Sequence, residues 1–297
     1  MQWRFGRHEF AWQSPPRTLM HAAEAPVVMG VLNVTPDSFS DGGRFEGLER
    51  AVAHGLAMVE AGARIIDVGG ESSRPGAEPV PAELECARVV PVIEALRARA
   101  DVCISIDTVK ATVARAALAA GADVVNDITA MTGDEWMPAV AAEHGAGVVL
   151  MHMRGRPKTM QQGDLSSPDI VEEVAGYLSE RVEALVAAGV PRAAICVDPG
   201  IGFGKTVEQN LALVAGLPRL VAGGRPILLG VSRKSFIGAV TGRAVHDRLA
   251  GTDAVHAIGV WLGAHIVRVH DVAEARDVVR MAGALRAARD TGEGRGR

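Results

Sequence analysis

Polar side chains stand at the ends of seven short apolar runs in this 297-residue chain. Any one of them can be explained as a turn or a helix cap, which Asn and Asp favour. A cap needs no apolar strand beneath it, so the recurrence indicates that strands deliver polar groups to one shared edge. Such a set of carboxylates, amides and cations suits the binding of a small charged molecule. Its members are Asn33, Asp67, Asp107, Asn126, Asp198, Ser232 and Arg268 with His270.

Arg268 and His270 alternate along the last of these runs, so their side chains share one face. Two groups that can carry positive charge are costly to bury together without an anion. We therefore expect a phosphate or diphosphate beside them, with a structural ion pair as the alternative. Lys234 and Ser235 follow the preceding run, in the region where barrel folds commonly bind phosphate.

Two loops early in the chain are rich in groups that can close over a ligand. Residues 35–43 hold Phe39, Asp41 and two final glycines among hydroxyl-bearing side chains. This pattern predicts a mobile lid, the alternative being an ordinary polar loop. Residues 69–77 read Gly-Gly-Glu-Ser-Ser-Arg-Pro-Gly-Ala. Their paired glycines allow the backbone to approach a ligand closely, and Arg74 can pair with Asp41 or with a phosphate.

Residues 198–206 need to be tested against the phosphate-binding P-loop, because they contain Gly-Lys-Thr. The motif requires a glycine five residues before that glycine, and Pro199 occupies the position. The match therefore fails, and no mononucleotide site is predicted. The segment is better interpreted as a strand end at Asp198 followed by a loop that presents Phe203.

The elements that position these groups alternate along the chain. Short β-branched runs are followed by longer stretches of helical period, and glycines stand just past several helix ends. Eight such units without a composition break predict a single (β/α)8 TIM barrel, with the functional site at the C-terminal rim of the strands. A doubly wound open sheet is the alternative. The expected strands are residues 27–33, 64–68, 102–107, 123–127, 147–152, 194–198, 226–230 and 265–270. The expected helices are residues 48–61, 81–98, 110–120, 135–144, 168–188, 207–221, 248–262 and 272–289.

Composition and the chain ends set further bounds. A net charge of -4 argues against a general nucleic-acid binder, and three widely spaced cysteines fit a reducing compartment. No apolar run approaches the roughly 20 residues that cross a bilayer, and no secretory signal is present. We therefore expect a cytoplasmic protein that binds neither nucleic acid nor membrane. Residues 26–290 should form the catalytic domain, 1–25 an extension without assignable role, and 291–297 a disordered tail.

In their order along the chain, these motifs resemble those of dihydropteroate synthases, pterin-binding transferases of folate biosynthesis. One departure is Ser73, where many members have Thr, and the hydroxyl is kept. The resemblance implies the same barrel, a homodimer, and the joining of 6-hydroxymethyl-7,8-dihydropterin diphosphate to 4-aminobenzoate, which yields 7,8-dihydropteroate and diphosphate. The matching segments are residues 30–43, 65–77, 105–108, 125–128, 150–153 with 157–161, 198–205, 230–235 and 268–271.

The resemblance also implies roles for the matched residues. Asn33 would hold Mg2+, the expected cofactor, at the diphosphate. Arg268 would stack on the pterin ring and, with His270, bind the diphosphate. The remaining pterin-binding residues would be Asp107, Asn126, Asp198 and Lys234. The expected catalytic residues are Asp41, Arg74 and Lys234. The residues expected to contact the substrates from loops or to shape the aminobenzoate pocket are Ser73, Phe39, Pro75, Phe203 and Ser235.

The implied chemistry agrees with these residue types. Buried carboxylates accept the N–H donors of a pterin edge, and Asn126 and Lys234 can donate in return. Mg2+ and cationic side chains neutralise the charge of departing diphosphate, and a weakly basic arylamine then attacks the pterin-methyl cation. This dissociative route needs no protein nucleophile, in accord with a sequence that shows no plausible Ser–His or Cys–His pair at a strand end.

Two other functions remain open at this point. A pterin-binding methyltransferase domain shares the barrel and the carboxylates, but it works with a cobalamin partner and does not need residues 35–43 or 232–235. A non-catalytic relative that binds pterins or a partner protein would have lost the loop residues, and none is lost here.

Overall fold

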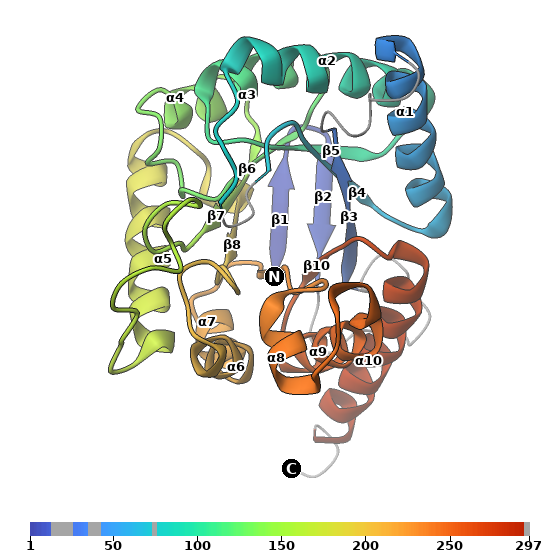
Figure 1. Cartoon of the computed structure of the whole chain (residues 1–297). Helices are drawn as coiled ribbons and strands as arrows, with labels where there is room; N and C mark the ends of the chain where they lie inside the picture. Colours follow the sequence, from blue (N-terminus) through green and yellow to red (C-terminus); the bar gives the residue numbers. More distant parts are fainter. Residues whose placement is uncertain (13–25, 35–42, 73–75, 294–297) are drawn as a thin grey trace.

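The computed structural model describes residues 1–12, 26–34, 43–72 and 76–293. Within these residues, eight parallel strands form a barrel that helices surround (Figure 1). The strand order is β8-β7-β6-β5-β4-β3-β10-β9, and a parallel bridge between Val197 and Ile227 joins the two ends of this series. The predicted (β/α)8 barrel is therefore confirmed, and the open sheet is excluded.

The barrel strands are short and almost wholly buried, as expected for parallel strands that are covered on both faces. Their ends lie within two residues of the predicted positions. Their bounds are β3 (Val27–Asn33), β4 (Ile65–Gly69), β5 (Cys103–Asp107), β6 (Val124–Asp127), β7 (Gly147–Met151), β8 (Ile195–Asp198), β9 (Leu228–Leu229) and β10 (Ile266–Val269).

The helices follow the strands as predicted. Several end at a glycine with positive φ, a conformation that favours glycine over other residues; Gly62 and Gly121 both have φ of 110°. The bounds are α1 (Gly43–Ala61), α2 (Ala82–Arg99), α3 (Ala111–Ala119), α4 (Met137–Glu143), α5 (Ile170–Ala187), α6 (Val207–Ala215), α7 (Leu217–Val221), α8 (Ser235–Thr241), α9 (Leu249–Leu262) and α10 (Val272–Glu293).

Some helix predictions need correction. The helix expected over residues 207–221 is two helices, because Gly216 ends α6 and Pro218 lacks the N–H that a continuous helix would use. Helix α8 was not predicted, since seven residues are too few to show a helical period. Helix α10 runs to Glu293, so residues 291–293 are helical rather than part of the predicted tail. Their N–H groups can still reach carbonyls of the preceding turn.

No role was predicted for the first twelve residues, which form a hairpin of β1 (Gln2–Phe5) and β2 (His8–Ala11). The Trp3 Nε1–H donates to the Ala194 carbonyl at 2.7 Å, just before β8. A Cβ on Gly147, the first residue of β7, would lie 2.7 Å from the Phe5 ring. The hairpin therefore packs against the N-terminal ends of the strands, opposite the rim. Its aromatic side chains are buried in the barrel core and are Trp3, Phe5, Phe10 and Trp12.

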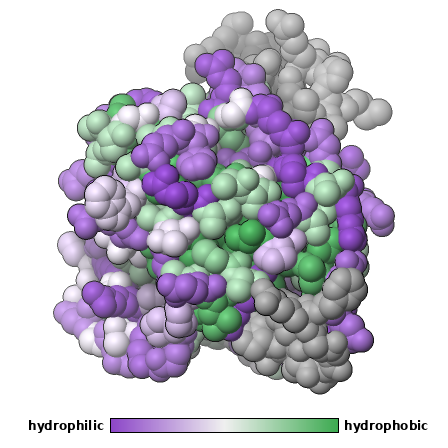
Figure 2. All heavy atoms as spheres, turned by 90° about the horizontal axis from the view of Figure 1, so that it is seen from above, coloured by the Kyte–Doolittle hydropathy of each residue, from purple (hydrophilic) through white to green (hydrophobic). Residues whose placement is uncertain are grey.

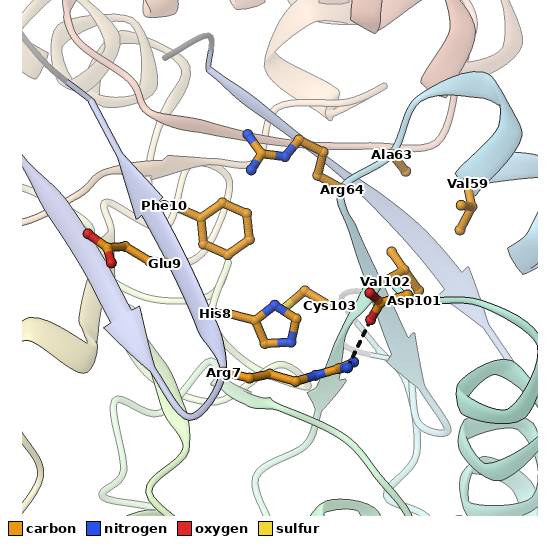
Figure 3. Close-up of a pocket in the computed structure, with 10 residues that line it drawn as sticks. All are labelled: Arg7, His8, Glu9, Phe10, Val59, Ala63, Arg64, Asp101, Val102 and Cys103. Atoms are coloured by element: carbon orange, nitrogen blue, oxygen red, sulfur yellow. Dashed lines mark ion pairs between the residues drawn. The ribbon is translucent and has the colours of Figure 1, made fainter. Parts of the chain in front are cut away.

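A pocket of about 390 Å³ lies beside the hairpin, at the same end of the barrel (Figure 3). Arg7 Nη1 pairs with Asp101 Oδ1 at 2.9 Å, and His8 Nε2 lies 3.1 Å from Asp123 Oδ1. Asp123 also pairs with Arg97. Although burial works against the charged form, the His8 contact and these neighbours lower the pKa of Asp123. These polar contacts attach the hairpin turn to the barrel.

Figure 2 shows the face seen from above, on which apolar atoms gather towards the middle and hydrophilic atoms mostly surround them. Among the residues that the structure describes, no helix is both long enough and apolar enough to cross a membrane.

The hairpin should contribute strongly to stability. Trp3 is fully buried, so Trp3→Ala should lower the free energy of unfolding by roughly 3–5 kcal/mol, the usual loss for a buried aromatic side chain. Trp136 is 65% exposed, and Trp136→Ala should change that free energy by less than about 0.5 kcal/mol. Urea denaturation of both variants measures the difference. Similar small effects would show that the hairpin is not part of the core.

Candidate functional site

The strand register brings the predicted rim residues to one level. Asn33 lies beside Gly69, Gly69 beside Asp107, and Asp107 beside Asn126. Asp198 is the last residue of β8. All of these positions are C-terminal ends of parallel strands, where barrel enzymes build their active sites.

Arg268 reaches from β10 to carboxylates on two other strands. Its Nε donates to Asp67 Oδ2 at 2.6 Å, and its Nη2 donates to Asp107 Oδ2 at 2.7 Å. Asp67 Oδ2 accepts a further hydrogen bond from Asn126 Nδ2 at 3.0 Å. The structural ion pair, which was the alternative for Arg268, is therefore present. It links three predicted site residues through Asp67, for which no role was predicted. Asp67 was expected at a strand end but lies in the middle of β4, because the strand continues to Gly69.

Burial sets the charge balance of this group. Burial raises the pKa of Asp107 to about 7, although Arg268 opposes the shift. Burial likewise works against the Arg268 charge, but Asp67 and Asp107 raise its pKa above the ordinary value. The guanidinium thus stays charged, whereas burial favours the protonated form of Asp107 more than it would for an exposed carboxyl.

Two more groups of opposite charge, Asp198 and Lys234, face the same space, and Lys234 Nζ donates to the carbonyl of Ile201. Burial raises the pKa of Asp198 and lowers that of Lys234 to about 8, and each residue limits the shift of the other. Both converge with Arg268 on Gly230, just past β9. A Cβ there would lie 3.8 Å from Asp198 Oδ2 and 3.9 Å from both Lys234 Nζ and Arg268 Cβ. Because Gly230 has no side chain, a space remains that is bordered by the Asp198 carboxylate, the Lys234 amine and the aliphatic part of Arg268.

The loop after β8 is held in place by Lys205, which is buried. Its Nζ donates to the carbonyls of His152, Gly200 and Phe203 at 3.2, 2.9 and 3.0 Å. Burial lowers its pKa to about 7. The failed P-loop match left Lys205 without a role, and only the folded chain shows one. Lys205 fixes the loop that places the Phe203 ring 4.7 Å from Lys234 Nζ.

His270 contacts Ser232, across the neighbouring strand ends. His270 Nδ1 lies 3.0 Å from Ser232 Oγ, and the His270 backbone N–H donates to the same oxygen at 3.3 Å. The expectation of no Ser–His pair at a strand end was wrong, because the two residues are far apart in sequence. Ser232 is buried, so the pair orients the imidazole rather than exposing a nucleophile. A hydroxyl proton donated to Nδ1 leaves the proton of a neutral ring on Nε2.

Two further predicted residues lie exposed at the ends of their elements. Asn33 ends β3 and is exposed at the rim, and Ser235 is exposed at the first residue of α8. Predicted residues outside the described part of the chain are Phe39, Asp41, Ser73, Arg74 and Pro75.

A metal ion was predicted at Asn33, and the residue present fits it. Mg2+ in nucleotide and phosphate sites takes one or two protein oxygens and completes its shell with water and substrate phosphates. The exposed carboxamide of Asn33 offers one such oxygen beside Gly69. Within the described residues, the group of three potential ligands His8, Cys103 and Asp123 lies at the opposite end of the barrel, where Asp123 already pairs with Arg97.

Comparisons with known proteins agree with this geometry. The family model described as "Pterin binding enzyme" matches residues 29–270. A dihydropteroate synthase from Synechocystis sp. is 47% identical over 271 residues, which cover 91% of this chain and 93% of the relative.

Solved structures extend the similarity to three dimensions. The Xanthomonas albilineans dihydropteroate synthase with 4-aminobenzoic acid has a TM-score of 0.83 and 46% identity, over 89% of this chain and 94% of that chain. The same organism's enzyme in complex with 7,8-dihydropteroate has a TM-score of 0.78 and 43% identity, over 91% and 95% of the two chains.

The two lysines of the site should behave differently when replaced. Lys234→Ala removes a donor from the pocket and should lower kcat/KM by about a hundredfold, the effect of losing a hydrogen bond from a charged group. Lys205→Ala leaves three carbonyls without their donor, so its main effect should be a lower Tm. Steady-state kinetics at a temperature well below both transitions separates the effects. Equal losses of activity would show that Lys234 does not line the site.

Proposed function

The chain belongs to the dihydropteroate synthase family, and we propose that it joins 6-hydroxymethyl-7,8-dihydropterin diphosphate to 4-aminobenzoate. The products are 7,8-dihydropteroate and diphosphate. Solved relatives carry 4-aminobenzoic acid and 7,8-dihydropteroate, which are one substrate and one product of this reaction. The observation that carries the proposal is the convergence of Asp107, Asp198, Lys234 and Arg268 at the C-terminal end of the barrel.

This group of side chains suits the polar edge of a pterin ring. Asp107 and Asp198 accept from the N–H donors of the ring, and Lys234 donates to its acceptors. The flat guanidinium of Arg268 can stack on the ring face. To do so, Arg268 gives up its hydrogen bond to Asp107 Oδ2, and that oxygen then accepts from the pterin.

The bond that breaks joins the pterin methylene carbon to a diphosphate oxygen. The oxygen leaves with the electron pair, and the resulting cation is conjugated with the ring. The amino nitrogen of 4-aminobenzoate then forms the new bond with its lone pair and releases a proton. Arg268 and a protonated His270 Nε2 lie on the same strand end and stabilise the charge of the leaving diphosphate.

Mg2+ is part of the proposal, with Asn33 as its protein ligand. When bound, the ion would neutralise further charge on the leaving group. Phe203 and Ser235 would border the aminobenzoate. The predicted lid over residues 35–43 would exclude water, which would otherwise capture the cation.

We also propose that two copies of this chain associate through α9 and α10. These helices pack on each other and expose apolar side chains on their outer faces. Ile258 is 52% exposed, Met281 62% and Leu285 56%. Exposed apolar side chains gathered on neighbouring helices are typical of a protein interface.

A charge on this face should disrupt the association. Met281→Glu should convert a dimer of the 31.1 kDa chain into monomer, because an unpaired carboxylate is costly to bury. Leu84→Glu is the matched control, since Leu84 is an exposed leucine on α2. Sedimentation velocity reads out the mass. A monomeric unmodified protein, or a dimer unaffected by Met281→Glu, would contradict the proposal.

Turnover tests the proposed reaction directly. With Mg2+ and both substrates, the purified protein should form 7,8-dihydropteroate. It should release diphosphate only slowly until 4-aminobenzoate is added, because the arylamine captures the cation. Chelation of Mg2+ should abolish activity, and added Mg2+ should restore it. Absence of product at high enzyme concentration would refute the assignment.

A further inference from the structure

Asp67 lies below the rim, in the middle of β4, and its side chain is fully buried. One of its oxygens, Oδ2, accepts from Arg268 Nε at 2.6 Å and from Asn126 Nδ2 at 3.0 Å. These donors come from β10 and β6, which lie two strands away from β4 on opposite sides of it. A single carboxylate oxygen therefore joins two residues of the pterin site that have no contact through their own strands.

We propose that Asp67 is a positioning residue, which sets the orientation of the Asn126 amide and holds the Arg268 guanidinium beside Asp107. This inference rests on the proposed function, because it assigns Asp67 a task in recognising the same substrate. Asp67 acts through its two partners and does not itself contact the substrate.

The first consequence concerns Asn126. An ionised carboxylate only accepts hydrogen bonds, so the Asn126 atom that faces Asp67 is the amide nitrogen. The other end of the amide, Oδ1, is thereby directed away from Asp67. Asn126 can therefore present Oδ1 to the substrate as an acceptor, and the second N–H of Nδ2 keeps the donor role expected from the sequence. A pterin group that meets Oδ1 is then an N–H donor.

The second consequence concerns Arg268. Its Nε is fixed by Asp67, and only its Nη2 bonds to Asp107. When a pterin N–H replaces Arg268 Nη2 as the donor to Asp107, the hydrogen bond from Arg268 Nε to Asp67 keeps the Arg268 side chain in place. The guanidinium can then turn over the ring without leaving the site. Asp67 also supplies a negative charge that balances Arg268 whichever partner Asp107 has.

Two substitutions of Asp67 separate positioning from simple charge. Asp67→Ala removes both hydrogen bonds and lets the Asn126 amide turn. It should raise KM for the pterin diphosphate by about ten- to a hundredfold, as expected for one misdirected polar contact. KM for 4-aminobenzoate should stay within about twofold. Asp67→Asn keeps an oxygen that can accept from both partners, so it should restore most of the pterin KM.

A double-mutant cycle tests whether Asp67 acts through Asn126. If it does, Asp67→Ala should raise the pterin KM less in the Asn126→Ala protein than in the unmodified protein, and the effect that remains is the part that acts through Arg268. Ser105→Ala is the matched control, because Ser105 is fully buried and stands directly beside Asp67 in the sheet register. It should leave both KM values unchanged.

The outcomes distinguish this inference from the assignment of function. An inactive unmodified protein would refute the function. An active protein in which Asp67→Ala lowers Tm but leaves the pterin KM unchanged would overturn the positioning role alone. Full additivity of Asp67→Ala and Asn126→Ala would overturn the action through Asn126.

Discussion

The site depends on burying opposite charges together at one end of the barrel. Arg268 holds two carboxylates within hydrogen-bonding distance, where neither would be tolerated alone. Removing one partner of such a group leaves an uncompensated charge, which costs far more than the pair itself contributes. The arrangement is therefore better explained by substrate recognition than by stability. A ring whose edge carries both donors and acceptors can replace part of this network without leaving any charge unpaired.

The rest of the structure keeps these groups in register. Neighbouring strands place Asp107 beside Asn126 because parallel pairing fixes their level to within a residue. At the opposite end, the hairpin covers the strand starts with buried aromatic rings. Lys205 has a similar role at the rim, where it donates to two carbonyls of the loop after β8 and to the carbonyl of His152, just past β7. Rigid supports of this kind set the precision of a site, since small errors in placement weaken every polar contact.

The sequence predicted what local patterns encode and missed what distant contacts decide. The strand over Val27–Asn33 was predicted to the residue, because its apolar run and polar end are both local signals. The hairpin was missed because the charged and polar residues Arg7, His8 and Glu9 interrupt the alternation of apolar and polar residues. The aromatic side chains of this segment are buried only because they pack against the barrel.

Within the site, residue identities were predictable and their pairings were not. Asp67 was expected at a strand end, but its task depends on Arg268, which is 201 positions away. The Ser232–His270 contact was missed for the same reason. Asn126 is the clearest example, because its side chain can donate or accept, and only the folded chain shows that one of its N–H groups is used by Asp67.

The two halves of the proposed reaction rest on different parts of the fold. Three of the residues assigned to the pterin, Asp107, Asn126 and Arg268, sit near strand ends and are fixed by their hydrogen bonds before any ring is considered. Those assigned to 4-aminobenzoate include Phe203 in the loop after β8 and Ser235 at the first residue of α8. Pterin recognition is consequently a property of the barrel itself. Substitutions at Ser235 can then change the response to aminobenzoate while leaving the Arg268 network in place, whereas substitutions at Phe203 also alter the surroundings of Lys234, whose Nζ lies 4.7 Å from the Phe203 ring.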